Sequence, residues 1–150
     1  MNKKLTLLVG GVLIAGIAVT YWNAQNAPTG HSMTPPDTSK ISRGDAIVNV
    51  TLPAELSGTA KIGEVAFNAK CAACHGTNAA GKNGIGPPFI YKTYKPGHHG
   101  DAAFLSAARN GVRSHHWRFG NMPPVEGLTD ADVKNIVTYI REVQRENGIN

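Results

Sequence analysis

The chain has 150 residues, of which 41% are hydrophobic, and this length predicts one small globular domain with an attached segment. The first 22 residues hold much of the apolar content, which excludes a large core in the remainder. Fifteen Lys or Arg against ten Asp or Glu give a formal net charge of +5, but no nucleic-acid recognition motif accompanies it, so we expect no nucleic-acid partner.

The N-terminal segment is apolar. Two lysines precede an uncharged run of eighteen residues, Leu5–Trp22, which as a helix would be roughly 27 Å long and nearly span a bilayer core of about 30 Å. A cleaved signal peptide is the alternative, but the candidate cleavage site after Ala27 has Gln25 at position −3, where a small residue is usual. We therefore predict that residues 1–22 are a membrane anchor, or an uncleaved signal, of the inner membrane, with the following domain in the periplasm.

Two further segments precede the predicted domain at residues 57–150. Residues 23–40 are rich in Pro, Ser, Thr and Asn and show no apolar period, which predicts a flexible linker. Residues 41–56 alternate partly at period two, which predicts an extended strap over the domain.

The domain is predicted to begin with a helix that has Ser57 or Thr59 as its N-cap. Positions spaced i, i+3, i+4 and i+7 form its expected buried face: Ile62, Val65, Ala66 and Ala69.

The sequence CAACH follows this helix and holds the only two cysteines, Cys71 and Cys74, next to His75. C-x-x-C-H is typical of covalent haem attachment, since thiols three residues apart on a helix share a face and the next residue supplies an imidazole. A zinc site would need a second ligand pair, and a thioredoxin-like pair would need a βαβ context. A structural disulfide is the third alternative, and haem attachment is favoured because His75 follows at once.

A second unusual stretch is RSHHWRFGNMPP, residues 113–124. Proline fixes φ and restricts the preceding residue, so Pro123 and Pro124 constrain Met122. Further helices are expected at 101–110, capped by Asp101, and after a capping box of Thr129 and Asp132. The last helix has an apolar stripe: Val133, Ile136, Val137 and Ile140.

Five motifs occur in the order in which they occur in class I c-type cytochromes of the small bacterial type: GEVAF, CAACHG, GIGPPF, NMPP and IVTYI. Residues 56–149 resemble that family. The resemblance implies a mostly α cytochrome c fold of three to four helices around one covalent haem c. It also implies His75 and Met122 as the iron ligands, and a Pro87 carbonyl that accepts the His75 Nδ1–H. Phe89 stands where the family usually has Leu. The resemblance further implies that the first and last helices cross near Gly63, Phe67 and Tyr139.

Other side chains are candidates for the haem propionates. Trp117 and Arg118 offer an indole N–H and a guanidinium fork, and Tyr91 is a further donor. The expected cofactor-binding set is Cys71, Cys74, His75, Pro87, Tyr91, Trp117, Arg118 and Met122. The pairs His98–His99 and His115–His116 have three interpretations: a sixth iron ligand, a second metal site near the haem edge, or hydrogen-bonding loop residues.

If His75 and Met122 fill both axial positions of the iron, no substrate can bind there. The resemblance therefore implies a monomeric single-electron carrier, not an enzyme. A haem enzyme or gas sensor with a labile sixth ligand is the alternative. Residues 70–118 hold seven Lys or Arg against one acid, a net +6, which predicts redox partners with an acidic docking face. An ordinary solvated surface is the alternative interpretation of this charge.

Overall fold

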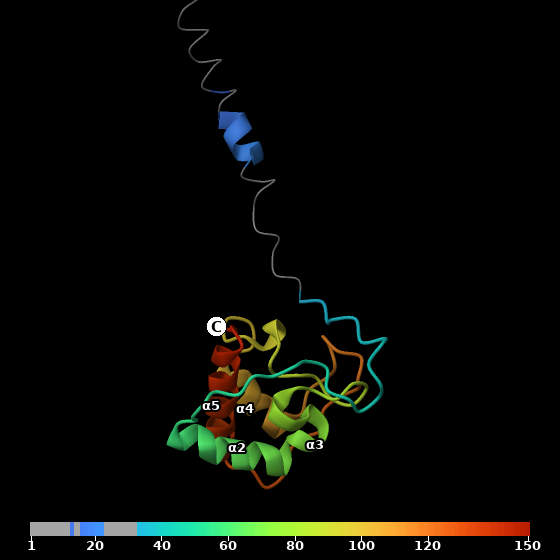
Figure 1. The fold of residues 1–150 in the computed structure, drawn as a ribbon, viewed down its shortest axis with the longest axis vertical. Helices are drawn as coiled ribbons and strands as arrows, with labels where there is room; N and C mark the ends of the chain where they lie inside the picture. Colours follow the sequence, from blue (N-terminus) through green and yellow to red (C-terminus); the bar gives the residue numbers. More distant parts are fainter. Residues whose placement is uncertain (1–12, 14–15, 23–32) are drawn as a thin grey trace, which may run out of the picture. The chain divides into compact units, whose positions relative to one another are not determined.

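The computed structural model describes residue 13, residues 16–22 and residues 33–150 (Figure 1). The chain divides into two compact units, Met1–Ser32 and Met33–Asn150, and the second contains every element named below. Its α-helices are α2 (Gly58–Lys70), α3 (Ala72–His75), α4 (Asp101–Asn110) and α5 (Asp130–Glu146), with 3₁₀ turns η1 (Thr77–Ala79) and η2 (Lys92–Tyr94). The described residues form isolated β-bridges but no strands, so the prediction of a mostly α fold is confirmed.

Helix α2 begins at one of the two predicted caps. The Ser57 hydroxyl accepts from the Ala60 amide at 3.3 Å, which satisfies an N-terminal donor of the helix. The same residue binds α5, because its amide and hydroxyl donate to the two carboxylate oxygens of Glu142. The cap thus also joins the first helix to the last.

The predicted buried face of α2 is wrong for three of its four residues: Ala66 is partly buried against the core, but Ala69 is exposed. Ile62 and Val65 are 59% and 68% exposed, whereas Ala60, Gly63 and Phe67 are buried. Both sets have helical spacing, so periodicity alone did not distinguish them. A close helix crossing decides the matter, since an added Cβ at Gly63 would overlap the backbone carbonyl of Asn135 in α5.

Helices α4 and α5 lie where they were predicted, with one difference at a cap. Gly100, not Asp101, is the N-cap of α4, and the Asp101 carboxylate instead accepts from Arg141 Nε at 2.9 Å. The capping box of α5 is present: Asp132 N donates to the Thr129 hydroxyl, and Thr129 N donates to the Asp132 carboxylate. The capping box satisfies N-terminal backbone donors of α5 and fixes where this helix, the longest of the unit, begins.

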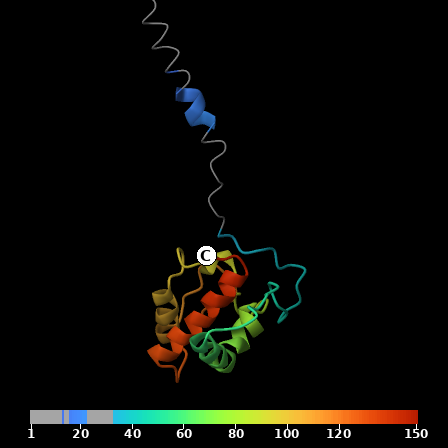
Figure 2. The same cartoon turned by 60° about the vertical axis from the view of Figure 1, so that its left-hand side comes forward.

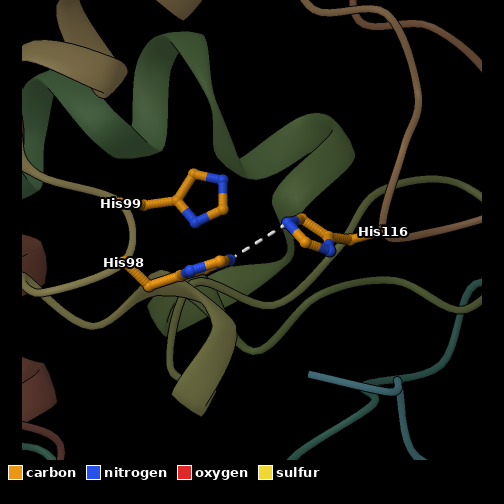
Figure 3. Close-up of side chains that lie close together, drawn as sticks. All are labelled: His98, His99 and His116. Atoms are coloured by element: carbon orange, nitrogen blue, oxygen red, sulfur yellow. Dashed lines mark hydrogen bonds between the residues drawn. The ribbon is translucent and has the colours of Figure 1, made fainter. Parts of the chain in front are cut away.

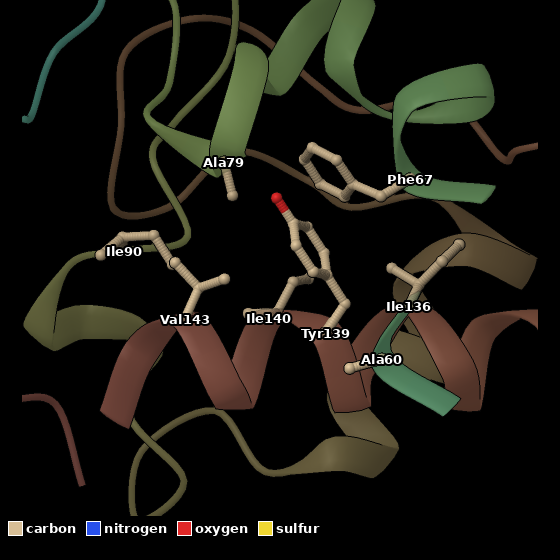
Figure 4. Close-up of a cluster of buried hydrophobic side chains, with 8 residues drawn as sticks. All are labelled: Ala60, Phe67, Ala79, Ile90, Ile136, Tyr139, Ile140 and Val143. Atoms are coloured by element: carbon tan, nitrogen blue, oxygen red, sulfur yellow. The ribbon is translucent and has the colours of Figure 1, made fainter. Parts of the chain in front are cut away.

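The core lies where α2 crosses α5 (Figures 1 and 2). Phe67 of α2 and Tyr139 of α5 are fully buried, with ring centroids 5.6 Å apart. Figure 4 shows Ile140 and Val143 of α5 on the same side of the helix, toward Ala79. The apolar stripe predicted for the last helix is therefore its buried side.

The segment before α2 packs on the domain. Amides of Ile47 and Val48 donate to the Ala80 carbonyl at 3.1 and 3.2 Å, and Ile47 is buried. Asn147 of the C-terminal turn exchanges two hydrogen bonds with the Thr51 backbone. Within the predicted linker, residues 33–40 also contact the domain, since the Thr38 carbonyl accepts from Asn83 Nδ2.

Most of the predicted anchor lies outside the described residues, as do residues 23–32 of the linker. In the part of the chain that the structure describes, no helix is both long and apolar enough to cross a membrane.

The crossing at Gly63 gives a stability prediction. Replacing Gly63 with Ala pushes a methyl group into the α5 backbone, so the free energy of unfolding is expected to fall by about 1–3 kcal/mol. Gly58→Ala in the same helix is the control, because an added Cβ there meets nothing within 4 Å. Denaturant titration of both variants measures the effect, and equal stabilities would contradict the close crossing.

Candidate haem site

The C-x-x-C-H sequence forms one tight turn at the end of α2. Cys71 ends that helix with its amide 2.7 Å from the Phe67 carbonyl, and its own carbonyl accepts from the amides of Cys74 and His75. Both cysteines are free thiols and line the same cavity. Burial, with a smaller contribution from Cys74, raises the pKa of Cys71 to about 11. The turn therefore brings two free thiols and one imidazole together at the cavity.

His75 is held by a second, distant segment. Its side chain is 7% exposed, and its Nδ1 lies 2.9 Å from the Pro87 carbonyl. A carbonyl only accepts, so Nδ1 carries the proton and Nε2 keeps the lone pair. Burial lowers the pKa of His75, although the Pro87 hydrogen bond opposes this. The result is a neutral imidazole with a fixed tautomer, which is the ligand form of histidine.

Phe89 fills the space beside this imidazole. The rings of His75 and Phe89 stack with centroids 4.1 Å apart and planes at 24°. Phe67, Tyr94 and Phe104 meet the other sides of Phe89 in edge-on contacts. The Phe89 ring thus restricts the rotation of the His75 ring.

A cavity of about 780 Å³ opens beside these residues. Its lining is mostly apolar and includes Phe104 of α4 and Ile140 of α5. Cys71, Cys74, His75 and Met122 all line it, although Met122 is 47 residues beyond His75. The tertiary structure therefore gathers both expected iron ligands and both thiols around one apolar space.

The backbone on both sides of Met122 is fixed. Met122 and Val112 exchange two hydrogen bonds of 2.9 Å, which form an isolated antiparallel bridge. The Asn121 side chain accepts from the Ser114 amide, which closes the loop further. The two prolines therefore act together with a hydrogen-bonded bridge that sequence patterns did not predict.

The predicted propionate donors lie in different places. Trp117 is buried and lines the cavity, and its Nε1–H, although close to the Tyr94 hydroxyl, has no hydrogen bond of good geometry to any described residue. Arg118 is exposed and does not line the cavity. Tyr91 donates its hydroxyl to the Thr34 carbonyl and packs edge-on against Trp117. Of the three, only Trp117 presents a donor at the cavity.

The residues present fit a covalently held haem. The cavity volume falls within the range of about 300–1,000 Å³ usual for ligand pockets, and its apolar lining suits a porphyrin face. The two thiols would form the thioether bonds to the porphyrin, and a neutral imidazole and a thioether are the axial donors that cytochromes c use. The buried indole N–H of Trp117 is a polar group that a propionate would satisfy.

Comparison with known proteins agrees with this geometry. The sequence profile of the family named Cytochrome c matches residues 60–144, more than half of the chain. The chain belongs to the cytochrome c family, so it is a c-type cytochrome that binds haem c and takes part in haem-based electron transfer. No curated protein and no solved structure matches the chain.

Two polar residues of α5 organise the site and were not predicted. Buried Arg141 donates to the carbonyls of Tyr94 and His99, and buried Gln144 donates to those of Phe89 and Tyr94. The sequence held one indication that these side chains are buried: they lie three residues apart on the last helix, beside its apolar stripe. They hold the loop between residues 89 and 99 against the last helix, and thereby hold Phe89 at the cavity.

The histidine pairs gather near the same cavity. His99 and His116 line it with His115, and His98 lies beside His116. Burial lowers the pKa of both His99 and His116, and the neighbouring histidines lower it further. The Thr93 hydrogen bond opposes the shift at His99. Both rings are therefore neutral near pH 7.

Gly111 gives a prediction about the Met122 loop. Its φ is +72°, and an added Cβ would overlap the Met122 carbonyl and touch Pro124. Gly120 also has positive φ, at +93°, but has nothing within 4 Å. Each change to Ala introduces backbone strain of about 1–3 kcal/mol, but only Gly111→Ala displaces the bridge.

Amide hydrogen exchange at Val112 and Met122 measures this difference. We expect exchange about tenfold or more faster in Gly111→Ala than in Gly120→Ala, because roughly 1.4 kcal/mol of bridge stability corresponds to that factor. Similar rates in the two variants would contradict a role for the close approach at Gly111.

Proposed function

We propose that this cytochrome is a single-electron carrier with one haem c, ligated by His75 and Met122. The main observation that supports this proposal is that His75 and Met122, from separate segments of the chain, line one cavity together with the two thiols. When bound, the haem iron supplies the one-electron chemistry. The protein supplies an imidazole whose tautomer is fixed by Pro87 and a thioether on a braced loop.

Bracing is important because a thioether is a weak, neutral donor. A weak ligand on a mobile chain dissociates easily, whereas the bridge from Val112 and the two following prolines keep Met122 in place. Thioether ligation also favours the reduced metal relative to a second imidazole, which raises the reduction potential. The arrangement thus suits a carrier that changes charge without exchanging ligands.

Replacing Met122 with Ala tests the ligand assignment. The haem is expected to stay covalently attached, while the ferrous protein gains carbon monoxide binding and the ferric protein loses its weak long-wavelength sulfur band. Absorption spectroscopy measures both changes. Met33→Ala is a matched control, because Met33 does not line the cavity, and it should behave like the unchanged protein.

Two outcomes would redirect the proposal. Carbon monoxide binding by the unchanged protein would indicate the haem enzyme or gas sensor instead of a closed carrier. If Met122→Ala stays closed, and the further loss of His115 and His116 opens it, one of those histidines is the ligand.

We propose that the electron-transfer partners present an acidic docking face. Lys70 and Lys82 donate to the backbone carbonyls of Glu126 and Ala73, so their charges are not neutralised by carboxylates. Lys70 also lines the cavity. Arg109, by contrast, pairs with Asp130 and contributes less to the positive face.

Electrostatic steering predicts a salt dependence. Electron-transfer rates with the physiological acceptor should fall steeply as the Debye length shrinks to about 8 Å near physiological ionic strength. Lys92→Glu should slow association, whereas Lys134→Glu, in the more acidic C-terminal part, should have little effect. Stopped-flow kinetics over a salt series measures this, and rates that ignore both salt and Lys92 would exclude the docking proposal.

We also propose that residues 1–22 anchor the chain in the inner membrane, with the haem domain in the periplasm. The uncharged run of eighteen residues and the poor cleavage site support this. N-terminal sequencing of the mature protein should begin at Met1, and extraction should need detergent. A soluble protein that begins near Ala24 or Pro28 would exclude the anchor.

A further inference from the structure

Three imidazoles from two loops converge beside the haem cavity. His98 and His99 precede α4, and His116 follows it (Figure 3). One ring nitrogen from each lies within 4.8 Å of the others. Loops on opposite ends of a helix thus bring their histidines to one point.

The nitrogen spacing suits a tetrahedral ion. Zinc–nitrogen bonds of about 2.0–2.1 Å at a tetrahedral angle place two ligand nitrogens roughly 3.3 Å apart. The Nε2 atoms of His98 and His116 are 3.3 Å apart. The widest separation allowed by the cluster, 4.8 Å, exceeds this by about 1.5 Å. Rotation of the exposed His98 side chain and a small movement of its neighbours would close that difference.

His99 is supported as metal-binding histidines usually are. Its Nδ1–H donates to the Thr93 carbonyl at 2.7 Å, which fixes the tautomer and leaves the Nε2 lone pair. Thr93 is fully buried, and Arg141 holds the His99 carbonyl at 2.5 Å. This imidazole is therefore oriented by the core of the domain, not by solvent.

We propose that His98, His99 and His116 bind one late first-row transition-metal ion, such as Zn²⁺ or Cu²⁺, at the rim of the haem cavity. Imidazole is a favourable donor for both ions. Three protein ligands leave a fourth tetrahedral position for water or a small anion. This site is separate from the iron ligands and does not depend on the proposed electron-carrier function.

A bound dication would also influence the cavity. His99 and His116 line the same space as His75 and Met122, so the ion's charge would lie close to the haem. Positive charge favours the reduced, less positive iron, and the reduction potential should therefore rise when the ion binds. This consequence, unlike binding itself, rests on the proposed electron-carrier function.

Isothermal titration of the untagged holoprotein with Zn²⁺ tests the site. We expect one ion per chain, and about 10- to 100-fold weaker binding in each of His98→Ala, His99→Ala and His116→Ala. His115→Ala is the matched control. Its ring is 4.3 Å from that of His116, but it is not one of the three histidines whose ring nitrogens converge. Its affinity should stay within about threefold of the unchanged protein. The haem absorption spectrum checks that each variant is folded.

The outcomes separate the two parts of the inference. Absence of a one-to-one Zn²⁺ complex, or unchanged affinity in the three variants, would overturn the site, and loss of binding in His115→Ala would overturn this ligand set. Spectroelectrochemistry with Zn²⁺, and with Mg²⁺ at equal ionic strength, tests the coupling. One-to-one binding with no rise in potential would leave the site in place and exclude its influence on the haem.

Discussion

The hydrogen bond between His75 Nδ1 and the Pro87 carbonyl is the contact on which the site depends. It joins the C-x-x-C-H turn to a residue twelve positions later and leaves the Nε2 lone pair of the imidazole free. Close packing makes the contact possible, because an added Cβ at Gly86 would overlap the Cys74 carbonyl. The attachment motif and the proline segment are thus one unit: the absence of a side chain at Gly86 allows the close approach, and the Pro87 carbonyl fixes the tautomer of His75.

Helix α5 connects this unit to the rest of the domain through two kinds of contact. Its apolar stripe packs on Phe67 and Ala79, while Arg141 and Gln144 bind backbone carbonyls of the loop that contains Phe89 and Tyr94. Buried polar side chains are costly unless hydrogen-bonded, and these two are. Arg141 also donates to the His99 carbonyl. The last helix therefore positions both Phe89, beside the cavity, and His99, in the histidine cluster.

Rigidity in the second half of the domain has a different origin. The Met122 loop contains no regular secondary structure of its own, and its order comes from one β-bridge, two prolines and a glycine at positive φ. The histidine cluster lies in the neighbouring loops and shares a cavity lining with Met122. Both features are products of loop geometry supported by buried helices, which is how small domains position reactive groups.

The sequence by itself determined the attachment motif, the positions of three longer helices and the stiffness of the Met–Pro–Pro segment, since these depend on local spacing and caps. Periodicity did not decide which face of α2 is buried, because two stripes of equal period compete. The close crossing at Gly63, which the family resemblance implied, selects one of them in the tertiary structure. Only the tertiary structure decided that Trp117 faces the cavity while Arg118 faces solvent, and that three histidines from two loops converge. Those outcomes depend on contacts between distant segments, which no local pattern encodes.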